Sequence, residues 1–127
     1  MQRTLLIALA VGVSLLVVSR SVFAHHAGGA YDTKNPVTMK GTVKEFRFTN
    51  PHTQIVVDVK DAQGNVVTWT GVMGPPARMY RSGWRTNTVK PGDQVEITGP
   101  PVKDGGKVMG VSKLLGPDGK ELGGGGE

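Results

Sequence analysis

Hydrophobic and polar residues alternate along several short stretches of the chain, which is the pattern of half-buried β-strands. In the first stretch the alternation shifts by one residue after Glu45, so that Phe46 and Phe48 carry the apolar side. A shift of this kind is typical of a β-bulge, which lets a sheet curl. The pattern predicts five strands, at residues 37–48, 54–60, 66–73, 94–99 and 107–115, and one short helix at residues 77–82.

The predicted helix lies between strands three and four and is marked by residues that start and stop helices. Pro75 and Pro76 precede it, where a missing backbone N–H does no harm, and Gly83 follows its end. So short a helix is unstable alone, so we expect it to pack on the sheet through Met79 or Tyr80. Three strands, a helix and two strands is the order of the OB-fold. We therefore predict an all-β, five-stranded, OB-like Greek-key barrel with one short helix.

Two tryptophans are expected in the core of this barrel. Trp69 shares the inward face of strand three with Val67 and Gly71, because side chains two residues apart lie on one face of a strand. Trp84 directly follows the helix and is expected to fill one end of the core. The remaining chain divides into a signal peptide at 1–24, an arm at 25–36, the barrel at 37–122 and a Gly-rich tail at 123–127.

The first 24 residues have the three parts of a signal peptide. Arg3 provides the positive start, residues 5–18 form an apolar run, and Val22 and Ala24 are small residues before the cleavage site. A membrane anchor is the alternative, but Arg20 interrupts the run after about 15 residues, whereas a bilayer needs about 20. We expect cleavage after Ala24, a periplasmic or secreted mature protein, and contact with the membrane only during export.

The composition limits how the mature domain is stabilised and what it binds. The chain has no cysteine, so neither a disulfide nor a lipid-modified cysteine is possible. Arg3 and Arg20 leave with the first 24 residues, so 15 Lys and Arg fall to 13 against 10 Asp and Glu, a net charge of +3. These charges are interspersed, and most of the aromatic residues are assigned to the core. We therefore expect no nucleic acid partner.

Three histidines give the main chemical hint. If cleavage follows Ala24, His25 becomes the N-terminal residue, and its α-amine and ring can chelate one metal together. A third nitrogen would come from His52 or His26. Cu(II) favours such tetragonal nitrogen ligands and is first in the affinity order. Zn(II) fits less well, because there is no cysteine and Asp32 is the nearest carboxylate to the arm.

Simpler interpretations of the same residues remain open. The two adjacent histidines are also typical of a solvated arm, and His52 of a turn. Arg78, Arg81 and Arg85 form a second cluster, which indicates either an anion site or a solvated helix face. No nucleophile, acid–base pair or phosphate-binding loop is recognisable, so we expect no catalysis. The rival to a small binding protein is a structural or protein-interaction module with no small ligand.

Four segments of the chain are similar to a known family. They are the arm HHAGGAYD, the block GTVKEFRFTNPH, the segment GWRTNTVKPGDQV and the ending GPDGKEL. Together they resemble a family of small exported bacterial proteins catalogued as a domain of unknown function. In that family a serine often follows the paired histidines and a tryptophan often precedes Thr-Asn-Pro-His. Here Ala27 and Phe48 stand at those places. The resemblance implies export and a single domain, and it implies no activity.

Overall fold

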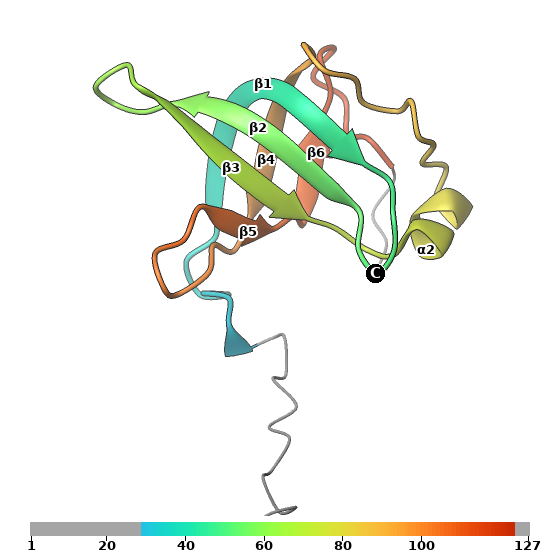
Figure 1. Cartoon of the computed structure of the whole chain (residues 1–127), viewed down its shortest axis with the longest axis horizontal. Coiled ribbons are helices and arrows are strands. Elements are labelled where there is room, and N and C mark those ends of the chain that lie inside the picture. The colour runs from blue at the N-terminus through green and yellow to red at the C-terminus, as the bar shows by residue number, and fades with distance from the viewer. Residues whose placement is uncertain (1–28, 124–127) are drawn as a thin grey trace, which may run out of the picture.

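The described part of the structure, a computed structural model, is residues 29–123 and is dominated by one curled sheet (Figure 1). The sheet has six strands in the order β5-β3-β2-β1-β4-β6. The elements are β1 at Val37–Arg47, β2 at Gln54–Lys60, β3 at Val66–Val72, α2 at Pro76–Arg81, β4 at Gln94–Gly99, β5 at Val108–Gly110 and β6 at Lys113–Leu115. The predicted fold class, an all-β and barrel-like domain, is confirmed, and residues 29–123 contain a single short helix.

The long first strand gives the sheet its curl. The beginning of β1 pairs with β4 and its end pairs with β2, both antiparallel. Its register against β2 shifts between Val43 and Glu45, so the bulge predicted from the alternation is confirmed. Gly41 lies at a close approach of β1 to β2, because a Cβ there would be 2.6 Å from the backbone oxygen of Asp58. A side chain at this position would therefore push the two strands apart.

The two edge strands of the sheet, β5 and β6, follow each other in sequence, so the chain itself connects the two edges of the curled sheet. β5 runs parallel to β3, and β6 runs antiparallel to β4. Residues 111–112 separate the two strands. We call the place where this β5–β6 junction meets the end of β4 the seam. Across it the Gly110 N–H donates to the Pro100 carbonyl, and the Ser112 N–H donates to the Thr98 carbonyl, each at 2.9 Å.

The seam also corrects the predicted strand count. Residues 107–115 were expected to form a single strand, the fifth, but they form β5 and β6, so the sheet has six strands. The physical reason is that the first half of this segment pairs with β3 and the second half pairs with β4. The chain must change neighbours between the two halves, and it leaves regular strand geometry at residues 111–112 to do so.

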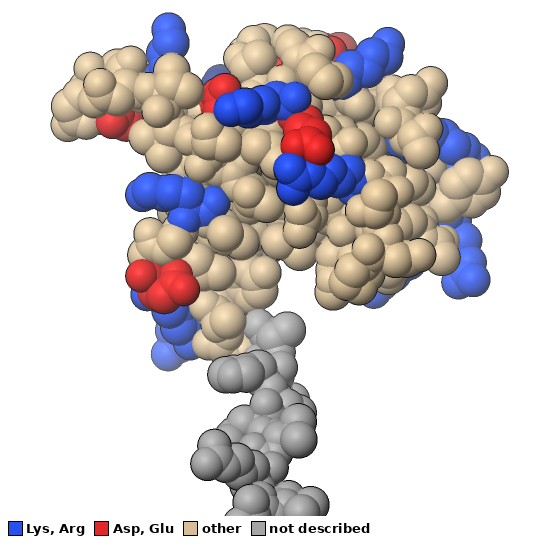
Figure 2. Space-filling view, viewed as in Figure 1, with Lys and Arg blue, Asp and Glu red and all other residues tan. Residues whose placement is uncertain are grey.

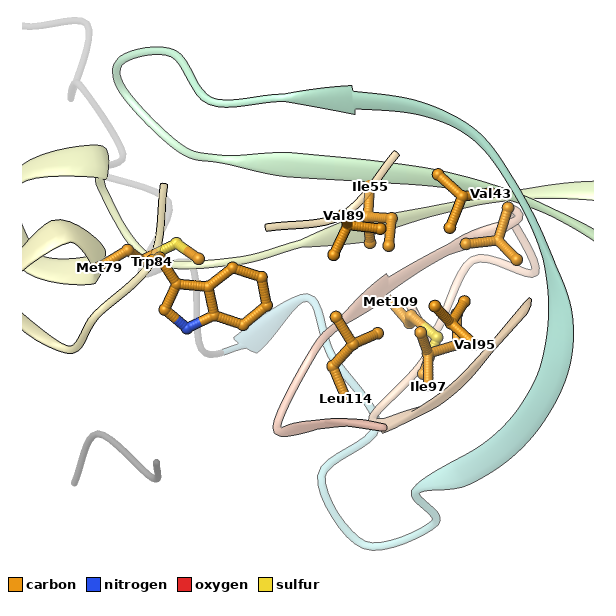
Figure 3. Close-up of a cluster of buried hydrophobic side chains, with 10 residues drawn as sticks. Val43, Ile55, Met79, Trp84, Val89, Val95, Ile97, Met109 and Leu114 are labelled. Carbon is orange, nitrogen blue, oxygen red and sulfur yellow. The ribbon is translucent and has the colours of Figure 1, made fainter. Parts of the chain in front are cut away.

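Ten buried hydrophobic side chains form the core inside the curled sheet (Figure 3). Trp84 is only 5 % exposed and packs at one end of this cluster, as expected. Trp69 packs against the core from β3 but is only partly buried, and the Lys107 Nζ lies 5.2 Å from the centre of its ring. The inward face predicted for Trp69 is therefore correct, while its burial is less complete than expected.

The short helix α2 covers the same end of the barrel as Trp84. Its bounds, Pro76–Arg81, are one residue earlier than predicted. Met79 is its buried residue, whereas Tyr80 is 56 % exposed, so the contact with the sheet is made by the first of the two candidates. The backbone N–H of Trp84 donates to the Met79 carbonyl at 3.1 Å and joins the two core residues directly. Within residues 29–123 there is no helix with the length and apolar character needed to cross a bilayer.

Candidate functional site

His52 is exposed on the link between β1 and β2, which passes close to α2 (Figure 1). The peptide bond between Asn50 and Pro51 in this link is cis. The next residue, Thr53, is fully buried. Its N–H donates to the Gly74 carbonyl at 3.0 Å, and its carbonyl accepts from the Met73 N–H at 2.9 Å. The link is thus fixed at its base to the end of β3, and it presents the imidazole of His52 to solvent.

The hydroxyl of Thr53 is unusual beside this exposed histidine. Among the described residues its Oγ1 is the buried side-chain oxygen without a hydrogen-bond partner. A buried polar group in this condition costs about 1–3 kcal/mol, which is why such groups are rare. The two backbone hydrogen bonds and the complete burial of Thr53 nevertheless hold the link in place.

The other two histidines of the predicted copper site, His25 and His26, lie outside the described residues. The described part of the arm begins at Gly29. The arm is attached to the barrel at Tyr31, which forms an isolated β-bridge with Val102. Within the described part of the chain no three His, Cys, Asp or Glu side chains gather as a metal site. The copper site therefore stays a prediction, and only its third candidate ligand, His52, has a described position.

The three arginines of the second cluster have different surroundings. Arg78 and Arg81 are exposed on α2. Arg85 lies over the ring of Tyr80, with its guanidinium carbon 3.8 Å from the ring centre, and its Nη1 donates to the carbonyls of Tyr80 and Trp84 at 3.0 and 2.7 Å. Arg85 is thus engaged with Tyr80 of α2 and with Trp84 by cation–π stacking and two hydrogen bonds.

A pocket of about 210 Å³ lies between α2, β6 and the end of the described chain. Arg78 is part of its lining, whereas Arg81 and Arg85 are not. The lining also includes Lys113 on β6 and Trp84. Sequence reasoning singled out Arg78 but missed the pocket, because Lys113 is 35 positions further along the chain and no local pattern connects them.

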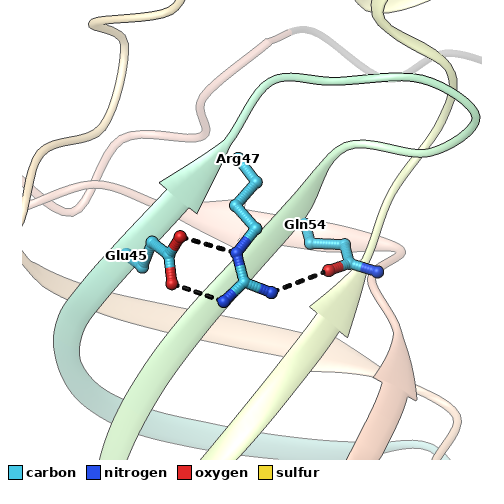
Figure 4. Close-up of polar contacts among 3 residues, drawn as sticks. All are labelled: Glu45, Arg47 and Gln54. Atoms are coloured by element: carbon cyan, nitrogen blue, oxygen red, sulfur yellow. Dashed lines mark hydrogen bonds and ion pairs between the residues drawn. The ribbon is translucent and has the colours of Figure 1, made fainter.

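The outer face of the sheet carries charges of both signs side by side (Figure 2). Its best-defined contact is the pair of Arg47 with Glu45, in which the Arg47 Nε donates to the Glu45 Oε1 at 2.6 Å (Figure 4). Arg47 also donates to the Gln54 Oε1 at 3.3 Å. The hydrogen bond from Arg47 lowers the pKa of the Glu45 carboxyl. Both side chains are exposed, so the pair orders this face and adds little stability.

The fold and the exposed link define a small, all-β, barrel-like domain over the described residues. Residues 12–112 match DUF6152, a family of unknown function, and the chain belongs to this family. The match confirms the resemblance to a family without an established function. No curated protein matches the chain.

Two solved structures are similar in part. The chain resembles TiaS in a complex with tRNA and ATP at 17% identity and a TM-score of 0.48, over 66% of this chain and 18% of the other. It also resembles a ZRD-deleted mutant of TiaS in complex with agmatine at 19% identity and a TM-score of 0.49, over 76% of this chain and 24% of the other. The chain thus spans at most a quarter of these larger proteins, and likenesses this remote carry no argument about what it does.

Proposed function

We propose that this protein is an exported, non-enzymatic binding protein that binds Cu(II) at the N-terminus of its mature chain. Cleavage after Ala24 frees the α-amine of His25, which chelates the metal together with its own imidazole. His52 or His26 supplies a third nitrogen. This set of nitrogen ligands suits the tetragonal preference of Cu(II). The observation that carries the proposal is the exposed side chain of His52 on a link whose base is fixed to the barrel.

The fixed base of the link supports a role for His52 as a ligand. A free loop must be ordered before it binds, and this ordering reduces affinity. Here Thr53 is already tied to Met73 and Gly74 by two backbone hydrogen bonds. The imidazole next to it can therefore meet a metal with little further loss of backbone freedom.

The length of the arm also allows the mature N-terminus and His52 to contribute to one metal site. The ring of Tyr31 packs near Gly110, which pairs with Val72, and Val72 pairs with Gln54, two residues from His52. Adjacent strands are about 4.8 Å apart, so crossing from Gly110 to Gln54 takes about 10 Å. An extended arm of six residues before Tyr31 reaches about 20 Å. The N-terminus of the mature chain is therefore long enough to approach the link in the same molecule.

The test of this proposal starts from protein made with its own leader and purified from the periplasm without chelator. Mass spectrometry should show a chain that begins at His25. Titration with Cu(II) at neutral pH should then give one tight site with the visible and EPR spectra of a nitrogen-rich type. Binding should weaken as the pH is lowered, since protons compete with Cu(II) for the imidazole and amine nitrogens.

One inserted glycine between Ala24 and His25 is the decisive control. It moves the α-amine away from the imidazole that shares the chelate and places His26 third from the N-terminus, so the ligand set and with it the visible and EPR spectra should change. If the glycine-extended protein binds copper with the same affinity and spectrum, the proposed chelate is wrong, and a structural or interaction module without a small ligand becomes the better account. His52→Ala and His26→Ala identify the third ligand, because only the variant that lacks it should bind more weakly.

A further inference from the structure

The pocket between α2 and β6 combines an apolar floor with two cationic residues. Met79, Trp84 and Leu114 are part of its lining, and all three are less than 8 % exposed. Arg78 of α2 and Lys113 of β6 also line it. Neither of these two cations is in a salt bridge within residues 29–123, where the ion pairs found are Lys40 with Glu96 and Arg47 with Glu45. From this arrangement we propose that the pocket binds a small monocarboxylate with an apolar body.

The hydroxyl groups of the pocket support the choice of an anion. The Ser82 Oγ donates to the Arg78 carbonyl at 3.3 Å, and the Ser112 Oγ donates to the Thr98 carbonyl at 3.1 Å. Both hydroxyl hydrogens are thus used within the protein. The side-chain donors left for a ligand are the indole N–H of Trp84 and the two cationic side chains. The cationic side chains form charge-assisted hydrogen bonds with carboxylates.

The overall charge of the lining selects a single negative charge. Glu121 also lines the pocket, so its cations exceed its carboxylates by one. A phosphate dianion would leave one negative charge uncompensated next to Glu121, whereas a carboxylate balances the site. The volume of about 210 Å³ lies below the roughly 300 Å³ at which pockets for drug-sized molecules begin. The ligand is therefore small, and its apolar part lies against Trp84 and Met79.

This site is independent of the copper proposal, because none of its residues is a histidine. The probe is benzoate, which joins one carboxylate to a small apolar ring, and the readout is the pair of indole N–H signals in a ¹H–¹⁵N NMR spectrum. Trp84 lines the pocket and Trp69 does not. Benzoate should therefore shift the Trp84 signal in a saturable manner and leave the Trp69 signal in place. Benzyl alcohol and inorganic phosphate should each bind at least tenfold more weakly.

Two double variants of equal charge provide the matched control. Arg78→Gln with Lys113→Gln removes both cations of the pocket and should weaken benzoate binding at least tenfold, since hydrogen bonds to charged groups are the strong ones. Arg81→Gln with Lys103→Gln makes the same change of charge at exposed residues outside the pocket and should bind benzoate as the wild type does. Equal affinities for the two double variants, equal binding of benzyl alcohol, or no saturable shift of Trp84 would overturn the proposal.

Discussion

Gly99 is the position at which a single methyl group should do most damage to the fold. It is the buried last residue of β4 and faces the seam of the barrel. A Cβ placed there would overlap the Gly110 carbonyl oxygen and lie 3.2 Å from the Ser112 nitrogen. Both are backbone atoms, so no side-chain rotation relieves the clash. We predict that Gly99→Ala forces β4 away from the β5–β6 junction.

The size of the effect follows from the contacts at the seam. Overpacking of this kind costs about 1–3 kcal/mol. The two neighbouring hydrogen bonds, Gly110 N–H to Pro100 and Ser112 N–H to Thr98, contribute about 1 kcal/mol each. Removing a glycine from the unfolded chain returns about 0.4–1 kcal/mol. The net loss in the free energy of unfolding should be about 2–4 kcal/mol, which lowers the Tm of a domain of this size by about 10 °C or more.

Urea unfolding followed by tryptophan fluorescence measures this loss directly. Gly74→Ala is the matched control, because a Cβ there would meet only the Met79 Cγ at an ordinary 3.6 Å. The control should stay within about 1 kcal/mol of wild type. Faster hydrogen exchange at the Ser112 amide would localise the damage to the seam. A Gly99→Ala protein as stable as Gly74→Ala would refute the close approach of β4 to the junction.

Two further predictions concern the core and an exposed turn. Trp84→Ala should cost about 3–5 kcal/mol in a urea titration, whereas Trp69→Ala should cost clearly less because its ring is partly exposed; equal losses would contradict the observed burial. Hydrogen bonds from Asn65 and Gln63 lower the pKa of the Asp61 carboxyl below its ordinary value of 3.8. The contribution of Asp61 to stability should therefore be present above pH 3.8 and disappear as the pH falls through the lower folded pKa, and comparing wild type with Asp61→Ala from pH 7 to 2 tests this.

Much of the fold could be predicted because local patterns determine it. The bulge near Glu45 was visible as a shift in the alternation, since a strand exposes its period of two directly in the sequence. The helix could be predicted because Pro75 precedes it and Gly83 follows its end. The break in the fifth strand was not visible, because residues 111–112 leave the strand only to change pairing partners. Which strand each half pairs with depends on β3 and β4, which are distant in sequence, so the local alternation of apolar and polar residues does not predict the change.

The candidate sites show the same division. Arg78 and Arg85 were grouped because they are close in sequence, yet Arg85 stacks on Tyr80 while Arg78 lines a pocket with Lys113. Sequence proximity on a short helix says little about which cations meet, since the turn after the helix redirects the chain. Likewise, Tyr80 was as good a candidate as Met79 for contact with the sheet, because a helix of six residues is too short for a periodicity that would choose between them.

The junction between β5 and β6 also affects how this protein meets other copies of itself. An open strand edge is a template for pairing with a second chain. Here the outer side of β5 is occupied by the bond from the Val102 N–H to the Val108 carbonyl, and the outer side of β6 by the bond from the Leu122 N–H to the Leu114 carbonyl. Both strands at the ends of the sheet order are therefore covered. Addition of a foreign strand is therefore blocked along β5 and β6, whereas residues 66–69 of β3 extend beyond the pairing with β5.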